Sequence, residues 1–286
     1  MPDYSEYEEY EDDIGLDSDE DKKFIKSGNQ DWFKGDKGRT YRVAFVYFHP
    51  LDVVAVMAAK KKNPEITDEE IEKLVQKVLS KRAEEVGKPV DQLADHEKLD
   101  LRRVQFKRIR AHFKEGFGYV VSRLGKDGKD ADRIWEQLGE PRDYFSTLLL
   151  IYPTDRDGDV DKAELSKGKG WVVNPWRFSG KVAERVMSLG KSLRNNDLSL
   201  AAQDLTMKCT NSEYQNFDLD PAGKAIWLQS PKFRSKVLEA ALKLYSKMNP
   251  FREMSTADVR IKLGISDGDV GESVDEEDWS GMLGNV

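Results

Sequence analysis

Apolar and polar positions alternate along several short stretches of the chain, and a period of two residues predicts β-strands. The pattern occupies residues 31–48, 102–125, 144–152, 170–178, 203–221 and 224–228. Turn-forming glycine, asparagine and aspartate separate these stretches, and a tight hairpin is expected near Asn211 and Ser212. The chain therefore has enough predicted strands for a small antiparallel β-barrel.

One segment between the first two strand-like stretches has the period of an α-helix instead. Its apolar residues form a single stripe: Ile71, Leu74, Val75, Val78 and Leu79. Thr67 and Glu70 are spaced as a capping box, Ile66 can pack on Ile71, and Gly87 is suited to end the helix. Residues 51–62 are also compatible with a helix. We therefore expect residues 51–100 to form a helical insertion.

Three further helices are expected. Residues 129–141 form a short one, with Gly139 near its C-cap, and another runs from Ser179 to Gly190. The last begins after Ser230, with Pro231 in its first turn, where proline is favoured. Strands and helices together predict an α+β protein.

Charge is distributed very unevenly along the 286 residues. Residues 1–21 hold eleven carboxylates and residues 267–286 hold seven, and neither segment has a lysine or arginine. The residues between them carry all 46 basic side chains and 35 acidic ones, a net charge of about +11. We therefore expect an acidic disordered segment at residues 1–26, a basic folded core at 27–264 and an acidic tail at 265–286.

Several classes of protein are disfavoured by what the sequence lacks. No apolar run approaches the eighteen residues of a membrane span, and the acidic N-terminus does not resemble a signal peptide. The single cysteine, Cys209, leaves no disulfide framework, which fits a reducing cytoplasm. No glycine-rich phosphate loop or nucleophile elbow occurs, and the three histidines are scattered. We therefore expect no enzyme, no cofactor and no membrane partner.

An alternating acidic run raises the question of calcium. Aspartates stand at positions 155, 157, 159 and 161, and Glu164 follows. With Gly158 at the turn position of a calcium-binding loop, Pro153 falls where the first aspartate should be. Starting the loop at Asp155 instead puts Val160 at the glycine position. We therefore expect the run to form the tip of a long hairpin, between the strands at 144–152 and 170–178, and to bind no calcium.

Basic and aromatic residues are interleaved on the predicted strands. Cations that follow phosphates and rings that stack on bases are the means by which proteins bind single-stranded nucleic acid. The scaffold that usually carries this chemistry is the OB-fold barrel. The alternative for the tryptophans is a place in the core. The candidate contact residues are Lys34, Lys37, Arg39, Arg42, Arg108, Arg110, Phe113, Lys114, Phe117, Tyr119, Arg123 and Trp171.

The order of these segments resembles a known family. "HFKEGFGYVVSRLG" (112–125), "YFSTLLLIYPTDRDG" (144–158) and "GKGWVVNPWRFSGKVAERV" (168–186) follow one another as in the T4-type phage single-stranded DNA-binding proteins. The closing "LTMKC" hairpin and the acidic C-terminus are similar too. The resemblance spans about half of the chain. It implies an OB-fold-like core and adds Trp176, Arg177, Phe178 and Lys181 as DNA-binding residues.

The chain also departs from that family. The family holds zinc through three cysteines and a histidine, but no cysteine lies near His112, so we expect no zinc. The family begins with a basic segment used for cooperative binding, whereas this chain begins with an acidic one. The insertion at 51–100 has no counterpart in the family's pattern.

The resemblance implies a non-enzymatic protein that binds single-stranded DNA with little sequence preference. It would act in phage DNA replication, recombination and repair, in the host cytoplasm. The tail would recruit replication proteins such as a polymerase, a helicase loader or a primase. The tail residues expected to do so are Asp275, Glu276, Glu277, Asp278, Trp279, Met282 and Leu283. Three alternatives stay open: a single-stranded RNA-binding or transcription-associated protein, an acidic mimic of nucleic acid, and a metal-dependent nuclease.

Overall fold

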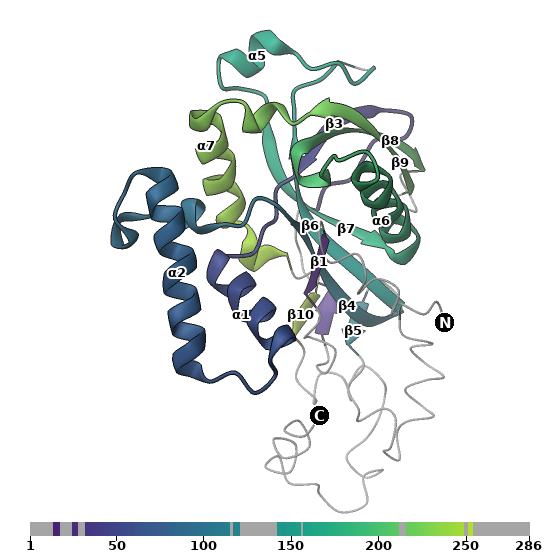
Figure 1. Ribbon diagram of the computed structural model, residues 1–286. Coiled ribbons are helices and arrows are strands. Elements are labelled where there is room, and N and C mark those ends of the chain that lie inside the picture. The colour runs from purple at the N-terminus through teal and green to yellow at the C-terminus, as the bar shows by residue number, and fades with distance from the viewer. Residues whose placement is uncertain are drawn as a thin grey trace, which may run out of the picture. The chain divides into compact units, whose positions relative to one another are not determined.

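Figure 1 shows the computed structural model of the chain. The chain forms two compact units. The structure describes residues 14–17, 25–27, 32–114, 117–120, 142–155, 157–211, 216–248 and 251–253. The first unit comprises residues 1–17, 31–107 and 145–248, and the second comprises 18–30, 108–144 and 249–286. Each unit is described by itself below.

The larger sheet is mainly antiparallel. Its strand order is β1-β4-β6-β3-β8-β9, with β5 paired to β4 and β7 paired to β6. Strand β3 pairs antiparallel with both β6 and β8, β8 pairs antiparallel with β9, and β1 runs parallel to β4. These pairings confirm the predicted α+β class, and the expected strand pairs are present, β6 with β7 and β8 antiparallel with β9. The bounds are β1 Ile14–Asp17, β3 Thr40–Phe45, β4 Val104–Lys114, β5 Phe117–Val120, β6 Arg142–Ile151, β7 Val172–Ser179, β8 Gln203–Asn211 and β9 Asn216–Lys224.

Strand β3 lies inside the sheet because its alternate residues are apolar. Tyr41, Val43 and Phe45 are buried, whereas Arg42 between them is half-buried. Val43 is opposite Leu205 of β8 and Ile151 of β6, so both neighbouring strands bring an apolar side chain to the same place. The period of two separates buried Tyr41 from half-buried Arg42 at the start of β3, but Ala44 is 1% exposed, so both faces of the second half of the strand are buried.

Aromatic rings fill the centre of the first unit. The Trp176 ring lies 4.4 Å from Phe178, 5.3 Å from Phe217 and 6.4 Å from Phe45, measured between ring centroids. All four side chains are at most 2% exposed. They come from β3, β7 and β9, so one aromatic cluster joins three strands that are distant in the sequence.

The helical insertion has the predicted helices and caps. Helix α1 (Leu51–Lys62) is followed by α2 (Asp68–Val86) and two 3₁₀ turns, η2 (Val90–Gln92) and η3 (Asp95–Lys98). The capping box of Thr67 and Glu70 is formed, and Gly87 ends α2 with a positive φ of 72°. The ends of the insertion meet, because the Asp100 N–H donates to the His49 carbonyl at 2.9 Å beside a Pro50–Leu99 bridge.

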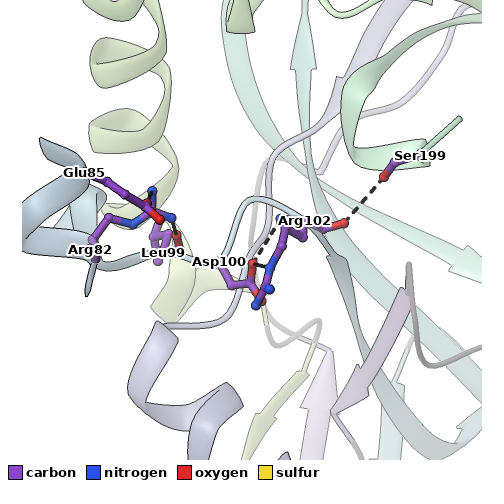
Figure 2. A network of polar contacts seen from close by, with 6 residues as sticks. All are labelled: Arg82, Glu85, Leu99, Asp100, Arg102 and Ser199. Carbon is purple, nitrogen blue, oxygen red and sulfur yellow. Dashed lines mark hydrogen bonds and ion pairs between the residues drawn. The ribbon is translucent and has the colours of Figure 1, made fainter. Parts of the chain in front are cut away.

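A polar network holds the point at which the chain returns from the insertion (Figure 2). Arg102 makes two side-chain hydrogen bonds to the buried Asp100 carboxylate, at 2.8 and 2.9 Å. Burial alone would raise the pKa of Asp100, but the bonds from Arg102 outweigh it and lower the pKa. Arg82 of α2 donates to the Leu99 carbonyl, and Ser199 donates to the Arg102 carbonyl. The network therefore ties α2 and the Ser199 region to the residues that precede β4.

Helices α6 (Gly180–Arg194) and α7 (Pro231–Leu242) cover other parts of the first unit (Figure 1). Ser179 precedes α6 and Ser230 caps α7, as predicted. Helix α6 continues past Gly190, where we expected it to end, because the buried Leu193 extends its apolar face by one turn. The short helix α5 (Lys162–Ser166) lies between β6 and β7.

Two sequence predictions are wrong in this unit. Residues 226–228, expected as a strand, form the 3₁₀ turn η5 (Ile226–Leu228). The Ile226 N–H donates to the Asp204 carboxylate and the Trp227 N–H to the Tyr152 hydroxyl, whereas the Leu228 N–H closes the turn on the Ala225 carbonyl. Residues 14–17, expected to be disordered, form β1, where "IGLD" pairs with β4. Two more 3₁₀ turns, η4 (Leu200–Ala202) and η6 (Tyr245–Lys247), complete the unit.

The second unit contains two short strand pairs. Strand β2 (Ile25–Ser27) pairs antiparallel with β10 (Phe251–Glu253), and the end of β4 pairs with β5. Arg108 of β4 forms an ion pair of 3.1 Å with Asp143 of β6. The helix expected at 129–141, the turn near Ser212 and the tail at 265–286 lie outside the described residues. Among the helices that are described, none is long and apolar enough to cross a membrane.

Candidate nucleic-acid interface

A loop with three exposed cations precedes β3, and we call residues 32–39 the basic loop. Its base is tightly packed: a Cβ on Gly35 would lie 2.7 Å from the Phe217 ring and 2.9 Å from the Cβ of Cys209. The Phe33 N–H donates to the Pro175 carbonyl at 2.8 Å. Only glycine at position 35 lets the loop approach the β8–β9 hairpin this closely. The loop is therefore fixed at its base.

The tip of the basic loop is fixed by Tyr41. The Tyr41 hydroxyl accepts from the Asp36 N–H at 2.9 Å and donates to the Asp36 carboxylate at 3.1 Å. Gly38, with φ of 79°, donates its N–H to the Cys209 carbonyl. The guanidinium of Arg39 lies 5.0 Å above the Tyr41 ring, a cation–π contact. Burial, the largest effect, raises the pKa of Tyr41, so its hydroxyl remains a donor at neutral pH.

This packing presents Lys34, Lys37 and Arg39 to solvent. Lys208 of β8 is also exposed, and it is opposite Thr40 in the sheet. The first three cations are predicted contact residues, whereas Lys208 is not among those predicted from the sequence. The alternation of buried Leu205, Met207 and Cys209 was the signal that would have placed it on the outer face.

An acidic loop, residues 153–161, lies beside the basic loop. A Cβ on Gly158 would lie 2.6 Å from the Cγ2 of Thr40, the residue that follows the basic loop, and Thr154 and Asp155 line one hollow together with Lys37 and Arg39. The Asp155 carboxylate accepts the N–H groups of Asp157 and Asp159, both at 3.0 Å. Asp161 caps α5 through two further N–H groups. These carboxylates shape the loop itself. The described residues include no group of three or more acidic, histidine or cysteine side chains arranged for a metal.

Two adjoining hollows lie along these loops. One has a volume of about 520 Å³ and the other of about 500 Å³, and they share Arg39, Thr154 and Asp155. Lys37 lines the first hollow, and Asp159 lines the second. Lys37 and Arg39 stand on one wall together with Asp36, whose carboxylate pairs with Arg39 at 3.4 Å, and Asp155, Asp159 and Asp161 line the other wall. The cationic wall attracts phosphates, and the carboxylates repel them but can accept hydrogen bonds from base amino groups.

The aromatic residues predicted to stack on bases are mostly unsuitable. Trp176 and Phe178 are 0% and 2% exposed, because Phe45 and Phe217 enclose them, so the prediction that they contact DNA is wrong. Trp171 is half-buried: its ring meets Phe233 at 5.4 Å, and its indole N–H donates to Gly168. Trp171 follows Gly170, which lines the second hollow. Among the predicted aromatics with described side chains, only Trp171 keeps an accessible face.

The other predicted contact residues fall into three groups. Arg42 is half-buried and donates to the Ala222 carbonyl of β9. Arg108 forms an ion pair with Asp143. Both arginines thus bind other parts of the protein, although the sequence predicted that they contact nucleic acid. Arg177 is half-buried, and Lys181 is exposed in the first turn of α6. The remaining predicted side chains lie outside the described residues: Arg110, Phe113, Lys114, Phe117, Tyr119 and Arg123.

A buried polar cluster lies behind the second hollow. The Tyr152 hydroxyl donates to the Asp204 carboxylate at 2.8 Å, and the Ile226 N–H donates to the other oxygen at 3.1 Å. The Trp227 N–H donates to the Tyr152 hydroxyl. Burial raises the pKa of Asp204 to about 6 and also raises that of Tyr152. The cluster joins β6, β8 and η5 beneath the hollow.

This cluster makes stability depend on pH. Between about pH 4 and pH 6 folded Asp204 keeps a proton that the unfolded chain releases, so its stabilising contribution is lost as pH rises through that range. From pH 4.5 upward the loss is on the order of 2 kcal/mol, at about 1.4 kcal/mol per pKa unit. Asp204→Asn is expected to remove this loss, measured by urea unfolding at pH 4.5 and 7. The control is the exposed Asp220→Asn, and an unchanged pH dependence in Asp204→Asn would contradict the prediction.

Comparison with known proteins gives no match to any protein-family model and no match to a curated sequence.

Proposed function

We propose that this chain binds single-stranded DNA with little sequence preference and is not an enzyme. The observation that carries the proposal is the basic loop, a rigid turn that presents three exposed cations beside two hollows. A rigid loop suits phosphate binding because little conformational entropy is lost on contact. The net charge of about +11 between the acidic ends adds long-range attraction for a polyanion.

The proposed path of the strand follows the two walls of the hollows. Phosphates contact Lys34, Lys37 and Arg39, and the carboxylate wall keeps them on that side. Bases face the second hollow, and the half-buried Trp171, next to the lining residue Gly170, is the stacking partner in this path. We further propose that the mainly antiparallel sheet is an OB-fold-like barrel of the kind found in T4-type phage single-stranded DNA-binding proteins. The biological setting would then be phage replication, recombination and repair in the host cytoplasm, with replication proteins recruited by the acidic tail.

Salt dependence of binding tests the electrostatic part of this proposal. Affinity for fluorescent oligo-dT is expected to fall with salt at a log–log slope of about −2 to −3, since each neutralised phosphate contributes about −0.7. Fluorescence anisotropy between about 50 and 300 mM salt would measure it. A flat salt dependence would exclude phosphate binding by the basic loop.

Competition experiments test the choice of nucleic acid. Oligo-dT is expected to displace the labelled strand better than duplex DNA, because only unpaired bases are free to stack. Oligo-U tests the sugar, since a protein that reads the 2′-hydroxyl distinguishes the two strands. Stronger displacement by oligo-U would favour the RNA-binding alternative, and equal displacement by duplex DNA would overturn the single-strand proposal.

A further inference from the structure

Helix α1 has an exposed apolar face that the first unit does not use. Leu51 and Ala59 are buried, but Val53 and Met57 are 38% and 53% exposed. Residues four apart lie on the same face of a helix, so Val53 and Met57 form one stripe. An amphipathic surface helix would have polar residues here. The apolar residues therefore suggest a surface that another segment covers.

Lysines continue this stripe. Lys60 and Lys61 follow Met57 by three and four residues, which places them on the same face, and Lys62 completes the last turn of α1. All three are exposed. From the N-terminal to the C-terminal end of α1, the face thus changes from apolar to positively charged.

The C-terminal segment of the chain has the complementary order. Four consecutive carboxylates, residues 275–278, are followed by Trp279, Met282 and Leu283. The spacing of these three apolar residues is that of anchors that bind a surface through one face of a helix. Laid antiparallel to α1, the segment brings residues 275–278 to the three lysines and its apolar residues to Met57 and Val53. The two sequences therefore match in both charge and order.

We propose that the C-terminal segment of one copy of the chain binds the exposed face of α1 in a second copy. The two surfaces differ from each other, so every copy keeps one face and one tail for further neighbours, and the association is open-ended. This interaction goes beyond single-strand binding. If the proposed function is also correct, it links neighbouring copies along a strand and makes their binding cooperative.

Self-association of the full-length chain, without nucleic acid, tests this proposal separately from the proposed function. In analytical ultracentrifugation at low salt, the average mass is expected to rise with protein concentration and to fall as salt screens the lysines. Met57→Glu and Trp279→Ala are each expected to weaken the association at least about tenfold, as hot-spot substitutions do. The matched control is Leu198→Glu, because Leu198 is 40% exposed but lies outside the insertion.

Mixing the two variants identifies the source of the tail. Met57→Glu keeps its tail and Trp279→Ala keeps its α1 face, so an equimolar mixture is expected to form dimers at a concentration at which each variant alone is monomeric. A full-length chain that stays monomeric at every concentration would overturn the proposal. So would association that survives Met57→Glu, or a mixture that stays monomeric, because the tail would then bind elsewhere or bind its own chain.

Discussion

Trp176→Ala is expected to lower the free energy of unfolding by about 3–5 kcal/mol, the usual cost of deleting a buried aromatic ring. The ring is fully buried and contacts Phe45, Phe178 and Phe217, so its removal leaves a cavity between β3, β7 and β9. Urea unfolding at neutral pH would measure the change in midpoint at constant slope.

Two further variants show that the loss comes from packing. Within the described part of the chain, the buried Nε1 of Trp176 has no hydrogen-bond partner, so Trp176→Phe loses volume but no hydrogen bond and is expected to cost clearly less. Trp171→Ala removes a half-buried ring and is the matched control, with a smaller expected loss. If Trp176→Ala unfolds as easily as Trp171→Ala, the aromatic cluster is not central to stability.

Reversing the charge of the basic loop is expected to have the largest effect on DNA binding. Lys34→Glu, Lys37→Glu and Arg39→Glu together should reduce oligo-dT affinity by about 100-fold or more at low salt and reduce the log–log salt slope by about 2. The fold should remain, because Gly35, Phe33 and Tyr41 anchor the loop and are unchanged. Anisotropy titrations at several salt concentrations would give both quantities.

Matched controls separate local contacts from net charge. Lys73→Glu, Lys77→Glu and Lys81→Glu on α2 make the same total charge change at exposed positions of the helical insertion. They are expected to reduce affinity only slightly. Asp159→Asn on the opposite wall of the hollow should raise affinity, because it removes a carboxylate that repels phosphate. Equal losses from the two triple variants would show that binding follows net charge and that the basic loop is not the site.

Local features of the sequence predicted the helices well. The capping box of Thr67 and Glu70 and the terminal Gly87 act within one helical turn, so no distant residue is needed to interpret them. The same is true of Ser230 and its following proline in α7. By contrast, residues 226–228 form a 3₁₀ turn because Asp204 and Tyr152, more than twenty residues away in the sequence, bind the N–H groups of Ile226 and Trp227.

The sequence predicted the exposed cations of the candidate site, but it did not predict which aromatic side chains are buried. Lys34, Lys37 and Arg39 stand in a glycine-rich turn, where side chains are usually exposed. Whether Trp176 faces solvent or the core depends on Phe45 and Phe217, which β3 and β9 bring to it. The alternation along a strand separates its side chains onto two faces but does not show which face other elements cover. Tertiary packing determines which face is buried.

The hydrogen bond between the Asp100 N–H and the His49 carbonyl joins the two ends of the insertion, so the sheet depends little on the length of the insertion. Because the chain leaves and returns at neighbouring points, the sheet needs only a short turn between these two residues. Loop-closure entropy changes slowly with length, so helices can be added, lengthened or removed here without shifting the register of β3 or β4. Over evolution this part of the chain can therefore gain or lose helical segments while strands β3 and β4 keep their places in the sheet.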